Sequence, residues 1–200
     1  MHEIALLKYH WPEYPARFDP GIPPLILLTL PAGTSRTIAR LHARELLLTI
    51  SAQLPRLGTE QPALLETPNG PKFSGSDLQI SLSYSGDKVL IGLSCNSTPG
   101  VDIVAIDRLS EIEAVSALYL PKSACQTVLN APDDRRTSSF ALAWAQLESC
   151  CKALSLPLAE IDSSRELAYA SCQLIDCEQI DGYSIALALG PNMSHVGAAN

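Results

Sequence analysis

The strongest constraint on the fold is the segment Trp144-Ala-Gln-Leu-Glu148-Ser-Cys-Cys-Lys152, in which an aromatic, a carboxylate and an ammonium group recur every four residues. Residues four apart share one face of an α-helix, so a helix would align Trp144, Glu148 and Lys152 in a row. We predict this helix from about Thr137 to Leu154. A glutamate four residues before a lysine is also an ordinary stabilising surface pair, and locally that interpretation stays open.

Asp102 is a second carboxylate that the fold must accommodate. It lies in Val101–Ile106, an apolar run that predicts a strand buried on both faces. An unpaired carboxylate buried there would cost several kcal/mol, so Asp102 needs a cation, a hydrogen-bond network or a strand end in water. Asp102 and Glu148 could converge on a divalent ion, because Mg²⁺ usually takes one or two protein carboxylates. Lys152 would then lie near substrate phosphates, a set suited to phosphoryl transfer.

The remaining segments predict helices segregated from mainly antiparallel strands, which is an α+β layout. Two similar lobes of about a hundred residues are possible, with a boundary near residue 100 that gives an N-terminal lobe 1–100 and a C-terminal lobe 101–200. The expected strands are 3–9, 78–85, 88–94, 101–106, 167–175 and 183–189, and the expected helices are 35–54, 110–120 and 137–154. Residues 58–71 are expected to be loop-like and to end in a turn, and the C-terminal tail is expected to be mobile.

The expected helix from the N-cap Ser35 to about Leu54 is amphipathic. Its basic stripe repeats every four residues, as Arg36, Arg40 and Arg44. This stripe is either a solvated helix face or a set of phosphate ligands, and the sequence alone favours neither. The apolar side is formed by Ile38, Leu41, Ala43, Leu46, Leu47 and Ile50.

Charge and composition exclude some classes of protein. A net charge of −7 without any basic run argues against a nucleic-acid binder. Leu25–Leu30 is apolar but too short to span a bilayer, and the N-terminus does not resemble a secretory signal, so neither a membrane location nor export is expected. The six cysteines contain no CxxC pair, and we interpret them as buried thiols in a reducing cytoplasm, with a disulfide framework as the lesser alternative.

Four motifs taken together resemble a known family. Gly70-Pro-Lys72, Leu82-Ser-Tyr-Ser-Gly86, Gly100-Val-Asp-Ile103 and Trp144-x-x-x-Glu148-x-x-x-Lys152 have the order and approximate spacing of the 4′-phosphopantetheinyl transferases of the larger, surfactin-synthetase-activating type. The resemblance covers about residues 36 to 160. It implies a pseudo-twofold monomer of two α+β lobes that binds coenzyme A and Mg²⁺, and that modifies a serine of an acyl or peptidyl carrier protein with release of 3′,5′-ADP.

The resemblance also implies residue roles. Asp102 and Glu148 would hold the Mg²⁺, Lys152 would contact phosphate, and Glu148 would accept the proton of the carrier serine, so that these three residues form the catalytic set. The nucleotide would be bound by Arg40, Lys72, Ser83, Tyr84 and Lys152. A docking patch for the carrier is expected at Lys122, Arg135 and Arg136.

Four positions depart from the family pattern. Val104 stands where the family usually has an acid, Tyr84 where it has a histidine, Leu147 where it has a lysine, and Ala124 near a usual glutamate. A homologue that binds coenzyme A or a carrier protein without turnover therefore remains an alternative to the transferase, as does an α+β domain of unrelated function.

Overall fold

The computed structural model describes residues 6–13, 25–54, 62–67, 70–95, 97–107 and 111–191. It divides into two compact units, one formed by Met1–Pro99 with Asn192–Asn200 and one by Gly100–Pro191. The described residues contain five helices and three sheets, which confirms the mixed α+β class. A pseudo-twofold relation between two lobes stays a prediction, and the expected mobile tail after Pro191 lies outside the described residues.

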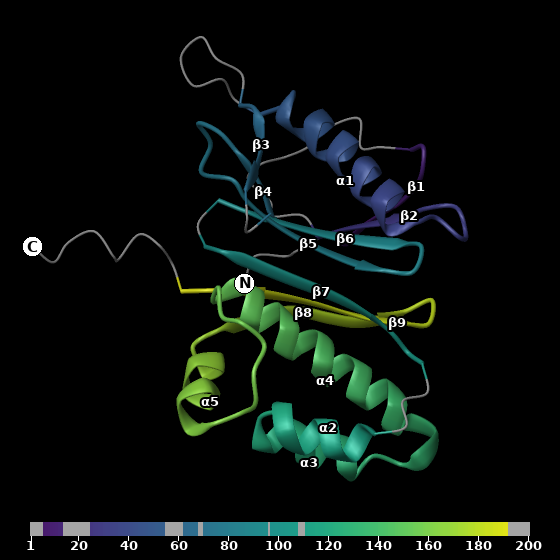
Figure 1. Ribbon diagram of the computed structural model, residues 1–200, viewed down its shortest axis with the longest axis vertical. Helices are drawn as coiled ribbons and strands as arrows, with labels where there is room; N and C mark the ends of the chain where they lie inside the picture. The colour runs from purple at the N-terminus through teal and green to yellow at the C-terminus, as the bar shows by residue number, and fades with distance from the viewer. Residues whose placement is uncertain are drawn as a thin grey trace, which may run out of the picture. The chain divides into compact units, whose positions relative to one another are not determined.

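The first unit contains a four-stranded sheet of order β1-β2-β6-β5 (Figure 1). Its strands are β1 (Leu6–His10), β2 (Leu25–Thr29), β5 (Gln79–Ser85) and β6 (Lys88–Ser94). The predicted hairpin of β5 and β6 is confirmed, whereas β1 and β2 pair in parallel. The sequence interpretation missed β2: its apolar run is an interior strand between β1 and β6.

Helix α1 (Arg36–Ser51) packs on this sheet, and it begins as predicted, with the Ser35 hydroxyl accepting a hydrogen bond from the Ile38 amide. Its predicted apolar face was partly wrong. Ala43 and its buried neighbours face the core, whereas Ile38 and Leu41 are 42% and 55% exposed. The buried face of the helix is formed by Ala39, Ala43, Leu46, Leu47 and Ile50.

Residues 58–71 were wrongly expected to be a loop throughout. Strands β3 (Leu64–Thr67) and β4 (Gly70–Phe73) form an antiparallel two-stranded sheet, in which Glu66 pairs with Pro71 and Leu65 with Lys72. The expected turn between them, at residues 68–69, lies outside the described residues. The strands are short and Pro71 lies within β4, so local propensity gave little sign of them.

The second unit is a layered α+β structure in which α4 lies between a sheet and two shorter helices (Figure 1). The sheet has the order β7-β9-β8. Its strands are β7 (Pro99–Ala105), β8 (Gln173–Ile180) and β9 (Tyr183–Leu189), and its helices are α2 (Ile112–Tyr119), α3 (Lys122–Leu129), α4 (Asp133–Ala153) and α5 (Ser163–Ala170). The predicted strands β7 and β9 and helices α2 and α4 are therefore present.

Three helices in this unit differ from expectation. Helix α4 begins at Asp133, four residues early, because Pro132 occupies the N-cap and two acids in the first turn suit the positive end of the helix dipole. Helix α3 was not predicted, although Pro121 precedes it in the same way. Helix α5 replaces the first part of the expected strand 167–175, because the Asp162 carboxylate caps its first turn through the Arg165 amide at 2.8 Å. For α2, the expected cap Ser110 lies outside the described residues.

Gly100 fixes the contact between β7 and α4. A Cβ atom built on Gly100 would lie 1.9 Å from the carbonyl oxygen of Ser149 and 2.4 Å from the backbone nitrogen of Ala153. Both atoms belong to the helix backbone, so strand and helix approach more closely than any side chain at this position would allow. This close approach sets Asp102, two residues later on the strand, against the last turns of α4.

Candidate active site

Strand β7 and helix α4 bring Asp102 and Lys152 into direct contact. The Lys152 ammonium donates a hydrogen bond to Oδ1 of Asp102 at 2.7 Å and another to the carbonyl oxygen of Val101 at 2.8 Å. The Asp102 side chain is only 5% exposed, so Lys152 supplies the cation that a buried carboxylate requires. Lys152 therefore forms its ion pair with Asp102 on strand β7. The spacing of residues along the helix did not indicate this partner.

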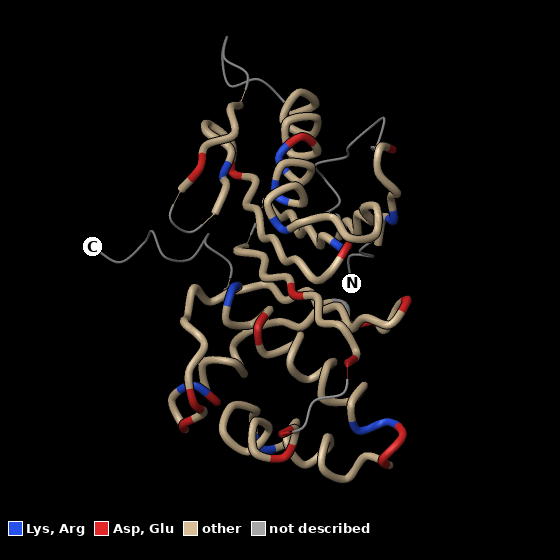
Figure 2. The backbone as a smooth tube through the Cα atoms, turned by 45° about the vertical axis from the view of Figure 1, so that its right-hand side comes forward, with Lys and Arg blue, Asp and Glu red and all other residues tan. Residues whose placement is uncertain are grey.

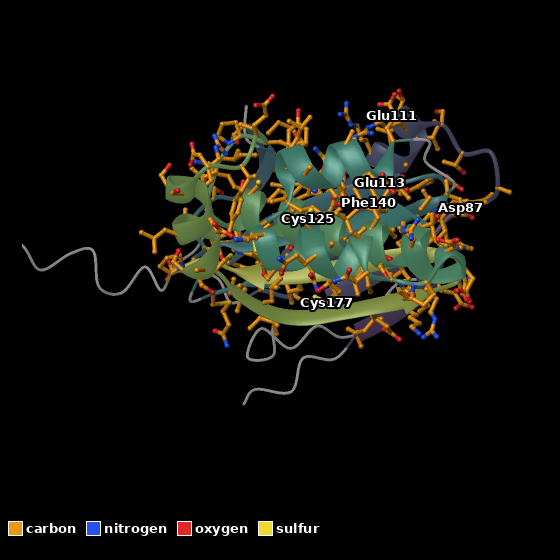
Figure 3. The ribbon with its side chains drawn as sticks, turned by 90° about the horizontal axis from the view of Figure 1, so that it is seen from below. Asp87, Glu111, Glu113, Cys125, Phe140 and Cys177 are labelled. Atoms are coloured by element: carbon orange, nitrogen blue, oxygen red, sulfur yellow. The ribbon has the colours of Figure 1, made fainter. Side chains whose placement is uncertain are left out.

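An aromatic cluster holds Glu148 in place. The Trp144 indole N–H donates a hydrogen bond to Oε1 of Glu148 at 2.8 Å. The indole stacks on Phe140, with ring centroids 5.6 Å apart, and meets the edge of Tyr119 at 5.7 Å. Phe140 is buried and is labelled on α4 in Figure 3. Because three packed rings fix the donor, they also restrict where the carboxylate can lie.

The environment of Glu148 disfavours its charged form. Burial raises its pKa above the usual glutamate value, and the nearby Asp102 carboxylate raises it further. The Lys152 ammonium and the Trp144 hydrogen bond act in the opposite direction without cancelling the effect. The two carboxylates are thus close enough to repel one another, and a cation placed between them would relieve that repulsion.

The donor set fits a divalent cation held by two carboxylates. Asp102 and Glu148 offer hard oxygen ligands, and Mg²⁺ commonly takes only one or two such groups from a protein. Val104 is on the same strand face as Asp102 and offers no oxygen. In the described part of the chain there is no group of three or more His, Cys, Asp or Glu side chains that could hold a metal. Any Mg²⁺ here would therefore depend on substrate and water for its other ligands.

A second polar cluster lies in the first unit, where α1 faces β5 and β3. Figure 2 shows basic residues recurring along α1. The Arg36 guanidinium lies over the Tyr84 ring, 5.5 Å from its centroid. Arg44 donates to the Tyr84 hydroxyl at 3.0 Å, and to both carboxylate oxygens of Glu66 at 2.7 and 2.9 Å. We call Arg36, Arg40, Arg44, Tyr84 and Glu66 the arginine cluster.

Electrostatics in the arginine cluster confirm that these groups interact. Burial raises the pKa of the Tyr84 hydroxyl, while Arg44, Arg40 and Arg36 oppose that rise. The hydrogen bond from Arg44 lowers the pKa of Glu66, and the charge of Arg40 contributes. Three guanidinium groups against one carboxylate leave this part of an acidic protein locally positive.

The structure separates Ser83 and Lys72 from that cluster. Ser83 is buried and is followed directly by Tyr84 on β5, so the two side chains point to opposite faces of the sheet. Lys72 pairs with Leu65 on the hairpin of β3 and β4, and therefore lies on the opposite face from Glu66. Of the four predicted nucleotide ligands in this unit, only Arg40 and Tyr84 are thus found together.

Sequence reasoning missed Glu66. It lies in a segment that was expected to be a loop, and its partner Arg44 is 22 residues away in the chain. No local pattern links the two residues, because their contact depends on how the hairpin of β3 and β4 packs beside α1.

The cysteines are thiols, as expected, but only two of them are buried. Cys150 and Cys151 on α4 are inside the second unit, whereas Cys95 is exposed. Cys125 and Cys177, labelled in Figure 3, are half-buried on α3 and β8. All six lie in the described part of the chain, and the alternative of a disulfide framework is not realised.

The predicted docking patch borders a hollow between α3 and α4. The hollow has a volume of about 670 Å³, and Arg135 contributes to its lining together with polar residues such as Gln126 and Asn130. Arg136 instead forms an ion pair with Asp133 at 2.8 Å. Lys122 is exposed at the start of α3. Lys122 and Arg135 are therefore the exposed members of the predicted patch, and of its three residues only Arg135 lines the hollow.

The protein is thus an α+β protein in which two neighbouring carboxylates, Asp102 and Glu148, lie close to the ammonium group of Lys152. The sequence model of the 4′-phosphopantetheinyl transferase superfamily matches residues 98–189, which includes β7, α4 and all three of those side chains. Arg40, Lys72, Ser83 and Tyr84 lie outside the matched range. No curated protein matches the chain significantly. The match supports a transferase and phosphopantetheine transfer in general.

None of the helices in the described part of the chain is both long and apolar enough to cross a membrane.

Proposed function

We propose that this protein transfers the 4′-phosphopantetheine group of coenzyme A to a serine hydroxyl of an apo acyl or peptidyl carrier protein. In this reaction the serine oxygen attacks the β-phosphorus, the bond from that phosphorus to the bridging oxygen breaks, and 3′,5′-ADP leaves. The observation that carries the proposal is the grouping of Asp102, Glu148 and Lys152 within the segment that matches the superfamily.

Asp102 and Glu148 are the residues that would hold Mg²⁺ in this proposal. When bound, Mg²⁺ would neutralise charge on the pyrophosphate and favour the departure of 3′,5′-ADP. Glu148, directly or through a water molecule, would accept the proton of the serine hydroxyl. Bound Mg²⁺ would favour the ionised form of Glu148, which is the form that can accept a proton.

Lys152 has capacity for a phosphate in addition to its structural contact. Its ammonium group has three N–H donors, and the contacts to Asp102 and Val101 use two of them. The side chain is 33% exposed, so the third donor can reach a ligand in solvent. Lys152 would thus neutralise Asp102 and orient the pyrophosphate at the same time.

The test is a mass measurement on apo carrier proteins incubated with the protein, coenzyme A and Mg²⁺. We expect the mass increment of one phosphopantetheine group, and a loss of rate of at least about a hundredfold in both Glu148→Gln and Asp102→Asn. Glu113→Gln is the matched control, because this acid is exposed on α2 (labelled in Figure 3) and should leave the rate unchanged. A fully active double variant of Asp102 and Glu148 would overturn the site assignment.

The second candidate function is binding of coenzyme A or a carrier protein without turnover. Val104 favours it, because the strand face beside Asp102 has no further oxygen ligand. Coenzyme A binding measured by calorimetry, without any mass increment on a panel of acyl and peptidyl carriers, would support this candidate over the transferase. Absence of both binding and transfer would argue against both functions.

A further inference from the structure

Glu66 occupies the side of Arg44 that a phosphate would use. A guanidinium binds oxyanions best through two parallel N–H donors, and Glu66 already takes such a pair, from Nε and one terminal nitrogen at 2.7 and 2.9 Å. The other terminal nitrogen donates to Tyr84 at 3.0 Å. A guanidinium has five N–H donors, of which Glu66 takes two and Tyr84 takes one, so a phosphate that binds the edge formed by Nε must displace Glu66.

The rest of the arginine cluster remains open to an anion. Arg40 is exposed on α1, and its charge acts on both Glu66 and Tyr84. The Arg36 guanidinium lies over the face of the Tyr84 ring and is exposed on the same helix. Glu66 itself is 61% exposed, so it can swing away from Arg44 at little steric cost.

We infer that Glu66 is an internal competitor for phosphate at the arginine cluster. It sets how strongly the protein holds a nucleotide that carries a second phosphate, on the 3′-oxygen of its ribose. This inference rests on the proposed function for the identity of the nucleotide. Glu66 lowers the affinity for such a ligand, because the Arg44–Glu66 pair occupies the Nε edge of Arg44 and places a negative charge beside the phosphate. The same pair keeps Arg44 ordered while no ligand is present.

The experiment compares the whole protein with its Glu66→Gln variant by calorimetry. The probes are adenosine 3′,5′-bisphosphate and adenosine 5′-monophosphate, which differ by the 3′-phosphate. Glutamine keeps the size of the side chain but removes the charge that competes with phosphate. We expect Glu66→Gln to bind the bisphosphate at least about fivefold more tightly, because the phosphate no longer competes with a charged side chain for Arg44. The affinity for the monophosphate should change less.

Glu45→Gln is the matched control. Glu45 lies next to Arg44 on α1 but pairs with His42 at 2.9 Å, and its substitution changes the net charge by the same amount. It should leave both affinities close to those of the unmodified protein. An equal gain in both variants would assign the effect to net charge and overturn the inference.

Two further outcomes would overturn it. Weaker binding in Glu66→Gln would make Glu66 a residue that orders the cluster for its ligand, and undetectable bisphosphate binding in both proteins would mean that the cluster is not a phosphate site. The transfer assay tests the proposed function separately. If no transfer occurs but Glu66→Gln still binds the bisphosphate more tightly, the proposed function fails and the role of Glu66 stands.

Discussion

At the scale of single residues, Asp102 is paired with the Lys152 ammonium. Its side chain is 5% exposed and pairs with Lys152 at 2.7 Å, so removing the ammonium would leave a buried carboxylate without this counter-ion. We predict that Lys152→Met lowers the free energy of unfolding by about 3–5 kcal/mol, measured by urea denaturation.

The double variant Asp102→Asn/Lys152→Met is the control for that prediction. With both charges removed, most of the lost stability should return, because the penalty comes from the unpaired charge rather than from the missing contact. If Lys152→Met alone is as stable as the unmodified protein, the ammonium acts as a substrate ligand and not as the counter-ion of Asp102.

Glu148 should give the stability a measurable pH dependence. Its pKa in the folded protein is raised by burial and by Asp102, so the folded state holds this proton more tightly than the unfolded chain does. Its contribution to stability is therefore largest below the ordinary glutamate pKa and declines as pH rises through the higher folded-state value. Glu148→Gln removes this decline.

The measurement is a series of urea denaturations of both proteins in metal-free buffer at increasing pH. The stability of the unmodified protein minus that of Glu148→Gln should fall across the window above the ordinary glutamate pKa. A constant difference, or one that rises with pH, would contradict the raised pKa. Metal-free buffer matters, because a bound cation would favour the ionised carboxylate and reverse the trend.

At the scale of secondary-structure elements, the backbone contact of β7 with α4 positions the site. We predict that Gly100→Ala costs at least about 3 kcal/mol of unfolding free energy, because the added methyl group meets two helix backbone atoms that cannot rotate away. Transfer activity should fall with it, since the strand that carries Asp102 must move. Chemical denaturation and the carrier mass assay measure the two effects.

Gly182→Ala in the same unit is the comparison. A Cβ there meets nothing within 4 Å, but the residue has φ of +80°, so only backbone strain of about 1–2 kcal/mol is expected. An equal loss of stability in both variants would mean that crowding against α4 is not the cause at Gly100.

The helices show where local signals were sufficient. Ser35 and the spacing of Trp144, Glu148 and Lys152 predicted α1 and α4, because caps and helical period are properties of neighbouring residues. Helix α5 also had a local signal, because Asp162 is a good N-cap residue. The apolar pattern alone had assigned part of this helix to a strand. By contrast, β3 and β4 had no local signal, since a short strand is stabilised by its partner.

At the scale of the whole molecule, charge constrains how a carrier protein can dock. The chain has a net charge of −7, and carrier proteins are typically acidic, so long-range attraction is absent and a local contact must bind the carrier. Arg135 is exposed beside the hollow between α3 and α4, while Arg136 is held by Asp133. We predict that Arg135→Glu raises KM for the carrier by about three- to tenfold with kcat little changed.

Lys8→Glu is the matched control for this prediction, because Lys8 is exposed on β1 of the other unit and the substitution changes the net charge equally. Steady-state kinetics at two salt concentrations would separate the local effect from the global one. Equal changes in both variants, or none in either, would remove the hollow from the docking surface.

The sequence by itself determined the α+β class, the helix that carries Trp144, Glu148 and Lys152, and the need of Asp102 for a cation, because these follow from spacing and from the cost of burying charge. Only the tertiary structure decided which partners meet. Lys152 neutralises Asp102, Trp144 holds Glu148, and Glu66 holds Arg44. Those pairings depend on how strands and helices pack, and packing joins residues that no local pattern connects.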